Sequence, residues 1–371
     1  MTSEKSFFFA GGGTGGHIYP AIAVAQQIRK INPNAKLHFF CSTRDIDKRI
    51  LAKTDFEYTP LPAVGFSARP AKIIPFCSAF LDSCRIARPI LVKAEKPVVI
   101  GLGGFVAAPV CWTAHRLRIP INLINIDIVP GRANKLLARF SKRLFLQFKD
   151  TERFFAKTRA QISVVGCPLR EAFTNPNPDK AIERLALDKQ KNILLITGAS
   201  SGSRSINDTV CSLLEKLDAF ASDWQIVHLT GTNDLENVTA AYAKAKIAHK
   251  ILDYCDDMPD LLAAADLLIG RSGAVSIAEY AAALLPSICI PYPHHKDKHQ
   301  YLHAAKLVEA AAAIIVDDLP DPKDRAEWLE EELLPLLRDE NERRQMAKGC
   351  RLLANTNAAR KIAEILLQPG S

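Results

Sequence analysis

The feature that most constrains this chain is a run of five glycines in six residues, Gly11-Gly12-Gly13-Thr14-Gly15-Gly16, followed at once by His17. The apolar residues 6–10 predict a buried strand before the run, and the apolar spacing over 18–31 predicts a helix after it. The glycines therefore lie where a strand ends and a helix begins. Free backbone N–H groups and the positive end of a helix dipole can hold an anion there. His17 adds an imidazole side chain, which can act as a general acid or base.

The glycine run alone does not define a function. Gly11, Gly13 and Gly16 also match the dinucleotide-binding fingerprint, which requires an acid at the end of the second strand to hold the ribose. The second predicted strand, 37–41, runs instead into Ser42-Thr43-Arg44, and the nearest acid is Asp45 on the next helix. An NAD(P)-dependent oxidoreductase is therefore a weak alternative. A turn that binds nothing would not need five glycines.

Composition points to a globular protein of two domains. The chain has 371 residues, of which 48% are hydrophobic and 24% charged. We expect neither a signal peptide nor a transmembrane helix, because the most apolar window, 98–114, contains three glycines and Pro109. The nine cysteines are scattered without a CxxC pair, which favours small core residues in a reducing compartment over disulfides or zinc ligands.

The net charge of +8 is unevenly distributed. Residues 1–165 carry 25 Lys and Arg against 10 Asp and Glu, whereas residues 166–371 carry 23 against 30. A basic first half favours a phosphorylated ligand or an anionic membrane surface as partner. Nucleic acid is excluded as a partner, because there is no zinc-finger spacing, RNA-recognition signature or arginine-rich tail.

Apolar runs alternate with helical segments along the chain, which predicts parallel sheets covered by helices. The strands are expected at 6–10, 37–41, 57–61, 97–101, 121–126, 143–147, 162–165, 192–197, 224–229, 249–253, 266–269, 287–291 and 312–316. A segment rich in Pro and Asn, 166–191, divides two Rossmann-like domains. We place the domains at 1–165 and 166–355, with a helix over 356–371 returning to the first.

Glycine-rich loops recur at the ends of strands. Gly101-Leu102-Gly103-Gly104 follows the fourth strand, and Gly198-Ala199-Ser200-Ser201-Gly202-Ser203 follows the first strand of the second half. The second of these offers amides and hydroxyls to a phosphate before a helix that begins near Arg204. Three such loops favour a phosphorylated ligand.

Two later segments also follow strands. Arg271-Ser272-Gly273-Ala274 opens a helix on which Glu279 could accept hydrogen bonds from a ribose diol. The segment 291–300 is rich in histidine, but Pro293 delays the helix that would align His295 with His299, so a phosphate-closing loop is favoured over a metal site. We interpret the adjacent acids Asp256-Asp257 and Asp317-Asp318 as solvated loop residues, because no Asp-x-Asp pair is present.

Six segments occur in an order and at a spacing that together resemble the MurG family, the bacterial glycosyltransferases of peptidoglycan synthesis in glycosyltransferase family 28. They are Gly12 to Ala21, Gly103-Gly104-Phe105, Pro130 to Lys135, Gly166 to Arg170, Arg271 to Ala274 with Glu279, and Asp297-Lys298-His299-Gln300. The set covers nearly the whole chain and is specific as a set, although no single member is.

The resemblance implies an α/β fold of GT-B type, with two Rossmann-like parallel-sheet domains facing across a cleft. It implies an inverting transfer of N-acetylglucosamine from UDP-GlcNAc to the C4 hydroxyl of N-acetylmuramic acid on undecaprenyl-linked lipid I, giving lipid II. The enzyme would lie peripherally on the cytoplasmic face of the inner membrane. No cofactor is required; a divalent ion is possible, but no motif indicates one. A transferase that uses a UDP-sugar on another lipid or saccharide acceptor is the main alternative, and a non-catalytic nucleotide-sugar or membrane-binding protein is a further one.

The resemblance also implies donor contacts. Thr14, Gly15 and Gly16 would border the sugar and diphosphate, with Arg170, Ser200 and Asp127 on the donor side. Cys255 would contact uracil through its backbone, Ala274, Val275 and Ser276 would lie beneath the phosphates, Glu279 would bind the ribose and Gln300 the sugar. Gly103, Gly104 and Asn134 are expected on the acceptor side.

Two departures from the family pattern stand out. The His-Glu-x-Asn that usually precedes the Pro-Gly pair is replaced by Ile124-Asn125-Ile126-Asp127. The third loop, usually Gly-Gly-Ser-x-Gly-Ala, has Ala199 and Ser203 in place of its second glycine and its alanine, which we interpret as a mild change between small residues. The first departure leaves the positioning of the acceptor open.

Inversion requires a base for the attacking hydroxyl. His17 is the first candidate for this base and Asp127 the second. Because the acceptor is lipid-linked, the first domain should contact a membrane, and residues 69–96 are the candidate patch. Its apolar members include Ile73, Phe76 and Phe80, and its cations include Lys72, Arg85 and Arg88. The alternative is an ordinary helix with its phenylalanines in the core.

Overall fold

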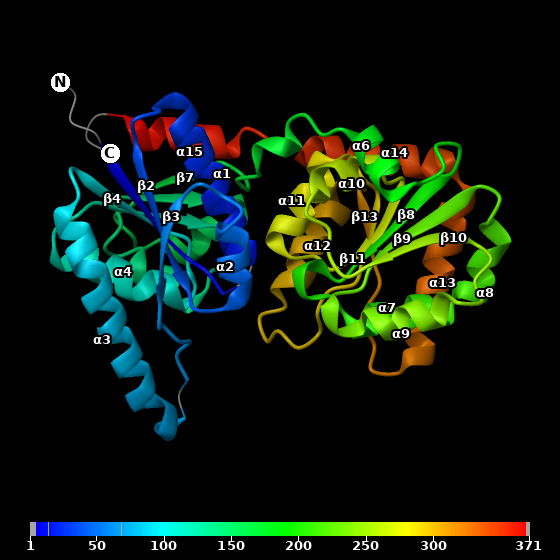
Figure 1. Cartoon of the computed structure of the whole chain (residues 1–371), viewed down its shortest axis with the longest axis horizontal. Coiled ribbons are helices and arrows are strands. Elements are labelled where there is room, and N and C mark those ends of the chain that lie inside the picture. The colour runs from blue at the N-terminus through cyan, green and yellow to red at the C-terminus, as the bar shows by residue number, and fades with distance from the viewer. Residues whose placement is uncertain (1–4, 14, 68, 369–371) are drawn as a thin grey trace. The chain divides into compact units, whose positions relative to one another are not determined.

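The computed structural model describes residues 5–13, 15–67 and 69–368, which form two compact units (Figure 1). The first unit comprises residues 1–170 together with 357–371, and the second comprises residues 171–356. Each unit is an α/β domain around one parallel sheet, as the alternation of strands and helices predicts.

The first unit contains a sheet of seven parallel strands in the order β3-β2-β1-β4-β5-β6-β7. These strands are β1 Ser6–Ala10, β2 Lys36–Ser42, β3 Glu57–Leu61, β4 Pro97–Gly101, β5 Ile121–Asn125, β6 Arg143–Leu146 and β7 Gln161–Val164. The helices between them are α1 Gly15–Ile31, α2 Asp45–Leu51, α3 Pro70–Lys93, α4 Gly104–Arg116 and α5 Arg132–Leu137, with the 3-10 helix η1 Lys149–Phe155 before β7.

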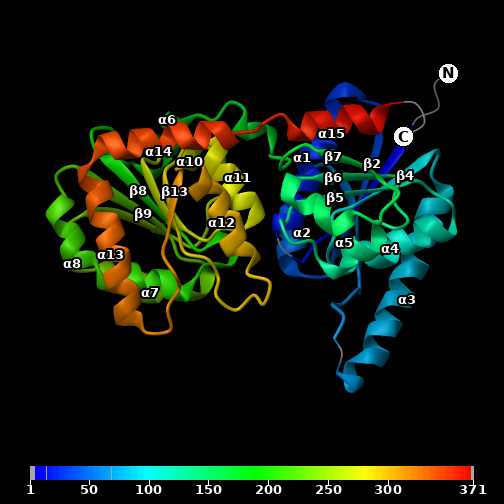
Figure 2. The same ribbon diagram turned by 180° about the vertical axis from the view of Figure 1, so that it is seen from behind.

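Helices cover both faces of this sheet (Figures 1 and 2). One face packs on α3, α4 and α5, whose buried side chains join those of the strands in one core, for example Leu91, Val110 and Leu137 with Phe8 and Leu123. The other face carries α1, against which the last helix of the chain, α15 Ala358–Leu367, packs. Arg143 donates to the carbonyl of Ile365 at 2.7 Å, which fastens α15 to the first unit.

The second unit contains a sheet of six parallel strands in the order β10-β9-β8-β11-β12-β13. These strands are β8 Asn192–Thr197, β9 Trp224–Leu229, β10 Ala248–Leu252, β11 Leu267–Gly270, β12 Ser287–Cys289 and β13 Ala313–Ile315. The helices are α6 Pro178–Leu185, α7 Arg204–Ser212, α8 Leu214–Leu217, α9 Leu235–Tyr242, α10 Met258–Ala264, α11 Ala274–Ala282, α12 His299–Glu309, α13 Pro322–Arg338 and α14 Glu340–Leu353. Short 3-10 helices cover Glu171–Phe173, Ala199–Ser201, Asp218–Phe220 and Thr232–Asp234.

The core of the second unit lies between its sheet and the helices α7, α8, α9 and α13. Buried Ile196 and Ile226 of the sheet pack with Val210, Tyr242 and Leu333 of these helices. The helices α10, α11 and α12 lie on the opposite face (Figure 1). Both faces of the sheet are therefore covered, which explains why its strands consist of nearly continuous apolar runs.

The two sheets place their glycine loops alike. In each, the first strand lies between strands that continue the sheet in opposite directions: β1 pairs with β2 and β4, and β8 pairs with β9 and β11. Ligands of open parallel sheets bind beyond the carboxyl ends of the strands at this switch point. The loops after β1 and β4 emerge at the switch point of the first sheet, and the loops after β8 and β11 emerge at that of the second.

Candidate functional site

A buried carboxylate forms hydrogen bonds with the first glycine loop, after β1. Asp47 of α2 is fully buried and accepts hydrogen bonds from the backbone N–H of Gly13 at 2.8 Å and of Ser42 at 2.9 Å. The Ser42 hydroxyl donates to it as well, at 2.5 Å. The Gly13 amide, in the loop that we expected to hold an anion, is thus already bound to an acid of the protein. Arg44, on the partly exposed side, donates to the Gly13 carbonyl at 2.8 Å.

His17 lies in the first turn of α1, beside the second glycine loop. A Cβ atom built on Gly104 would lie 3.9 Å from His17 Cε1, so the imidazole borders the start of α4. Gly103 and Gly104 have φ values of +89° and +72°, which favour glycine and bring this loop close to the first. The structure therefore brings His17, Gly103 and Gly104 together at one edge of the first sheet.

Asn134 adjoins the same place. A Cβ atom on Gly103 would lie 2.9 Å from Asn134 Nδ2, and this amide donates to Asn125 Oδ1 at 3.0 Å. Asn134 is buried, and its Oδ1 has no hydrogen-bond partner. Asn125 also donates to the carbonyl of Asp127 at 2.7 Å. The residues that replace the family's usual His-Glu-x-Asn thus form a bonded turn that holds Asp127.

The third loop, after β8, departs from our expectation that its two replacements are mild. Ala199 has a φ of +63°, a left-handed conformation that is unfavourable for a residue with a Cβ atom. The Ser203 hydroxyl accepts a hydrogen bond from Arg271 Nη2 at 2.7 Å, which an alanine could not do. The first replacement introduces backbone strain, and the second adds a charge-assisted hydrogen bond.

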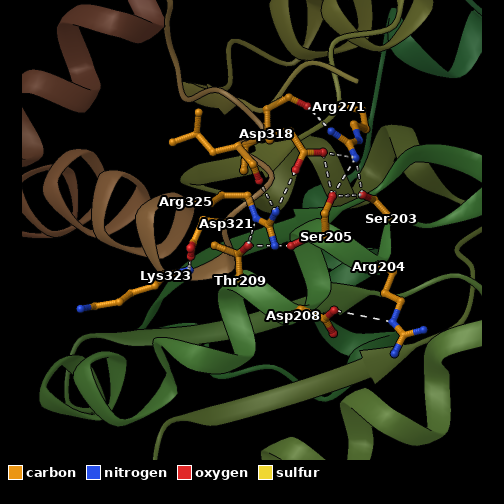
Figure 3. Close-up of polar contacts among 12 residues, drawn as sticks. Ser203, Arg204, Ser205, Asp208, Thr209, Arg271, Asp318, Asp321, Lys323 and Arg325 are labelled. Carbon is orange, nitrogen blue, oxygen red and sulfur yellow. Dashed lines mark hydrogen bonds and ion pairs between the residues drawn. The ribbon is translucent and has the colours of Figure 1, made fainter. Parts of the chain in front are cut away.

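Behind this loop lies a buried ionic network (Figure 3). Arg271, at the end of β11, donates to Asp318 at 2.8 Å and to the carbonyl of Ile290 at 2.9 Å. Asp318 in turn pairs with Arg325 of α13 at 3.2 Å. The side chains of these three charged residues are only 6–9% exposed. Burial lowers the pKa of the Arg271 guanidinium, and the hydrogen bond and charge of Asp318 act in the opposite direction.

Our interpretation of Asp318 as a solvated loop acid is therefore wrong, whereas Asp317 beside it is exposed. Asp256 is exposed, and Asp257 forms an ion pair with Arg184. Nothing in the sequence distinguishes Asp318 from its neighbours, because its partners, Arg271 and Ser205, lie far from it along the chain.

A cavity of about 820 Å³ opens over this network. Its lining comes from the loops after β8, β11, β12 and β13, and includes Gly198, Gly202, Ser203, Arg204, Ser205, Arg271, Gly273, Tyr292, Gln300, Asp318 and Arg325. Three cations and one acid contribute to it, so the cavity favours an anionic group.

The other expected donor residues of the second unit lie around these loops. Ala274, Val275 and Ser276 form the first turn of α11, and Glu279 lies on its second. Gln300 accepts from the Tyr292 amide at 3.0 Å, and its own carbonyl accepts from Ser272 at 2.9 Å. Among these, only Gln300 lines the cavity.

Two expected contacts are held by partners within their own unit. Cys255 is buried, and its sulfur accepts from Arg184 at 3.2 Å. Burial raises the pKa of its thiol, although Arg184 acts against this. The Arg170 guanidinium, in the first unit, stacks over the Tyr19 ring with its carbon 4.4 Å from the ring centre.

Two of the expected donor residues are described in part or not at all. Thr14 lies outside the described residues, and of Ser200 the structure describes only the backbone, in the short helix Ala199–Ser201. Gly15 and Gly16 form the start of α1. Within the described residues, no group of three or more His, Cys, Asp or Glu side chains could hold a metal ion. His299 lies in α12 and bonds Asp297 at 2.7 Å, while His295 precedes the helix.

The helix α3 projects from the first unit (Figures 1 and 2). Only Ser83, Ala87 and Leu91 of it are buried, so the alternative that its phenylalanines lie in the core is wrong. Phe76 lies against exposed Phe66 at 5.3 Å between ring centres, and Ile74 is 80% exposed. Lys72, Ile73, Arg85 and Arg88 are exposed, and Phe80 is half-buried. Across the described residues, no helix is both long and apolar enough to cross a membrane.

Two Rossmann-like units with glycine loops at their switch points define a protein of the GT-B class, as the sequence predicts. Comparison with known proteins identifies the family within this class. Residues 7–146 match the glycosyltransferase family 28 N-terminal domain, and residues 193–366 match the C-terminal domain of the same family.

Curated relatives extend the match over nearly the whole chain. Two are named UDP-N-acetylglucosamine–N-acetylmuramyl-(pentapeptide) pyrophosphoryl-undecaprenol N-acetylglucosamine transferase. The one from Acetivibrio thermocellus is 30% identical over 96% of each chain. The one from Paenarthrobacter aurescens is 33% identical over 98% of this chain and 96% of its own. The crystal structure of Acinetobacter baumannii MurG is similar with a TM-score of 0.68 and 25% identity over 98% of each chain.

The chain therefore belongs to the MurG family of glycosyltransferases, as its six matching segments predicted.

Proposed function

We propose that this protein transfers N-acetylglucosamine from UDP-GlcNAc to the C4 hydroxyl of the N-acetylmuramyl unit of lipid I, with inversion, giving lipid II. The observation that carries the proposal is the match to curated enzymes of that name over nearly the whole chain. The cationic cavity in the second unit supports it, because it suits the diphosphate of such a donor.

The second unit would bind the donor. The Arg271 guanidinium, the hydroxyls of Ser203 and Ser205 and the start of α7 all adjoin the cavity, and each stabilises negative charge. Fixed donors of this kind stabilise a departing diphosphate without having to reorganise during the reaction. Glu279 would bind the ribose and Gln300 the sugar. The reaction then requires no cofactor; a divalent ion is compatible with it but is not needed to neutralise the phosphates.

The first unit would supply the proton chemistry. His17 takes the proton of the attacking hydroxyl, with Asp127 as the second candidate for this role. The buried carboxylate of Asp47 makes the first glycine loop a poor place for a diphosphate, because it already occupies the Gly13 amide. We assign the loop instead to the attacking C4 hydroxyl of the acceptor, which is itself uncharged.

The projecting helix α3 would contact the membrane. Its exposed apolar residues and the cations Lys72, Arg85 and Arg88 suit insertion beside anionic headgroups. Such a contact would place the enzyme peripherally on the cytoplasmic face of the inner membrane, next to its lipid-linked acceptor.

Transfer of labelled N-acetylglucosamine to a synthetic lipid I analogue, with and without a chelator, tests this proposal. We expect one labelled product and equal rates in both conditions. Turnover of UDP-GlcNAc on other acceptors but not on the lipid I analogue would favour a different lipid or saccharide acceptor. The turn of Asn125 and Asp127, which replaces the family's usual motif, is the observation that favours this second candidate.

A further inference from the structure

The buried network of the second unit ties together the loops that would bind the donor. Arg271 Nη2 shares its two hydrogens among three neighbouring acceptors: Ser203 in the β8 loop, Ser205 at the start of α7 and Asp318 in the β13 loop. Its Nη1 donates to the carbonyl of Ile290, where β12 runs into the loop that precedes α12 and its residue Gln300. One guanidinium thus sets the relative positions of three loops that line the cavity (Figure 3).

Asp318 in turn holds this guanidinium in place. Its Oδ2 accepts from Arg271 and from the Ser205 hydroxyl, both at 2.8 Å, and its Oδ1 pairs with Arg325. Arg325 is anchored by bonds to Thr209 at 2.5 Å and to the Leu319 carbonyl at 2.7 Å. A planar guanidinium that donates hydrogen bonds from both of its terminal nitrogens, Nη1 and Nη2, has little freedom to rotate.

The charges around Asp318 show what this acid contributes. Two buried guanidiniums face one carboxylate, so the network keeps a net charge of +1 beneath the cavity. Without the carboxylate, the two cations would repel each other and Arg271 would lose the partner that aims it at Ser203. Nearby charges in a poorly solvated site interact strongly, so the loss of this carboxylate would affect the position of Arg271 more than the loss of a surface acid would.

We infer that Asp318 is a positioning residue for the donor diphosphate: it orients Arg271, and through it Ser203 and the third glycine loop, toward the phosphates. The inference rests on the proposed function, because it assumes that the second unit binds UDP-GlcNAc. Asp318 need not touch the donor, since it acts through Arg271. It would therefore determine the affinity for phosphate-bearing ligands rather than for the nucleoside.

Calorimetry with UDP and with uridine on Asp318→Asn tests this role. The variant keeps the shape of the side chain but loses its charge. We expect UDP to bind at least about tenfold more weakly and uridine to bind within twofold of the wild type. In the transfer assay, KM for UDP-GlcNAc should rise by a similar factor, and kcat should fall as well, because the same donors stabilise the departing diphosphate. If loss of negative charge alone mattered, UDP would bind more tightly, and that result or unchanged UDP binding would overturn the inference.

A second variant keeps the test valid if Asp318→Asn does not fold. Ser205→Ala removes only the hydroxyl that bridges Arg271 and Asp318, and we expect UDP binding about threefold weaker with uridine unchanged. UDP binding that is unchanged in this variant would count against the network as a positioning device.

Asp266→Asn is the matched control. Asp266 is a half-buried acid directly before β11 that accepts from the Ile193 amide at 2.8 Å, away from the cavity. The Asp266→Asn variant should have a lower melting temperature than the wild type and the same affinity for UDP. Failure of the wild type to bind UDP would refute the proposed function itself. UDP binding by the wild type with no change in Asp318→Asn would refute only this inference.

Discussion

The first and third glycine loops occupy equivalent places in their sheets, yet the charges behind them are opposite. After β1, the buried carboxylate of Asp47 binds the Gly13 amide. After β8, the buried guanidinium of Arg271 binds Ser203. A glycine-rich turn at a switch point therefore does not by itself identify a phosphate site. Under the proposed function, the charge of the buried residue behind each turn distinguishes the loop that binds the diphosphate from the loop that binds the attacking hydroxyl.

The largest expected effect concerns the proton chemistry that this comparison assigns to the first loop. Replacing His17 with Ala should lower kcat by about 10²–10⁴-fold, the usual contribution of a general base, while UDP affinity stays within twofold. The lipid I transfer assay and calorimetry measure the two quantities. If neither His17→Ala nor Asp127→Ala, nor both together, slows transfer at least about tenfold, the assignment of the base is wrong.

The two units should also differ in membrane affinity. Neutralising Lys72, Arg85 and Arg88 of α3 to Gln should weaken binding to vesicles with anionic lipid by about 1 kcal/mol per cation. The matched control is Lys244→Gln, an exposed cation of the second unit. Vesicle sedimentation measures the effect, and equal binding of the triple variant and the control would refute the membrane role of α3.

Acid should destabilise the protein through His228, which lies on β9 and bonds Tyr242 and Asn207. Burial lowers the pKa of this histidine from 6.5 to about 3 in the folded state. Below pH 6.5 the unfolded chain takes up a proton that the folded chain does not, so stability falls as the pH falls. Between pH 6.5 and 5 the loss should be about 2 kcal/mol.

Urea unfolding of the wild type and of His228→Gln at both pH values measures this loss, which should be absent in the variant. His38 lies on β2, which pairs with the first strand of its sheet as β9 pairs with β8. Burial also lowers its pKa, but Glu57 acts in the opposite direction. His38→Gln should therefore change the pH dependence less, and a larger change for His38 would contradict this comparison.

Asp47→Asn tests the closure of the first loop directly. Asparagine keeps one acceptor oxygen but replaces the other with an NH2 donor, which would face the Gly13 amide or the Ser42 amide, and it removes the negative charge that these donors stabilise. We expect kcat about tenfold lower with UDP affinity unchanged. Asp45→Asn, an exposed acid of the same helix, is the control. Weaker UDP binding in Asp47→Asn alone would place the diphosphate at the first loop after all.

The smallest effect concerns the strain of the third loop. Ala199→Gly should relieve the positive φ and stabilise the protein by up to about 1 kcal/mol, with little change in UDP affinity. Thermal unfolding measures it. The equivalent substitution at Ala186, which has a φ of +48° at the end of α6, provides a comparison outside the cavity. Destabilisation at position 199 alone would show that the Ala199 methyl group contributes packing.

Local patterns predicted the fold well. The period of the apolar residues located the thirteen strands that the described residues form, and the glycines after residues 10, 101 and 197 located the loops at the switch points. These signals are local, because a strand core and a strand-to-helix turn each depend on a few adjacent residues. The family resemblance added the function through the order of its motifs.

What decides the character of each loop could not be predicted in this way. Asp47 and Asp318 are ordinary acids in the sequence, one in a short helix and one in a pair of loop acids. Each becomes important only through partners that the fold brings to it from elsewhere, Gly13 for the first and Arg271 for the second. The strain at Ala199 depends on a backbone angle that its residue type does not reveal.

A crystal structure with bound UDP tests the central claim most directly. We predict that the diphosphate lies over the third loop, within hydrogen-bond distance of the backbone or hydroxyl of Ser203, while Asp47 keeps its bonds to Gly13. A diphosphate bound at the first glycine loop, with Asp47 displaced from the Gly13 amide, would contradict the account.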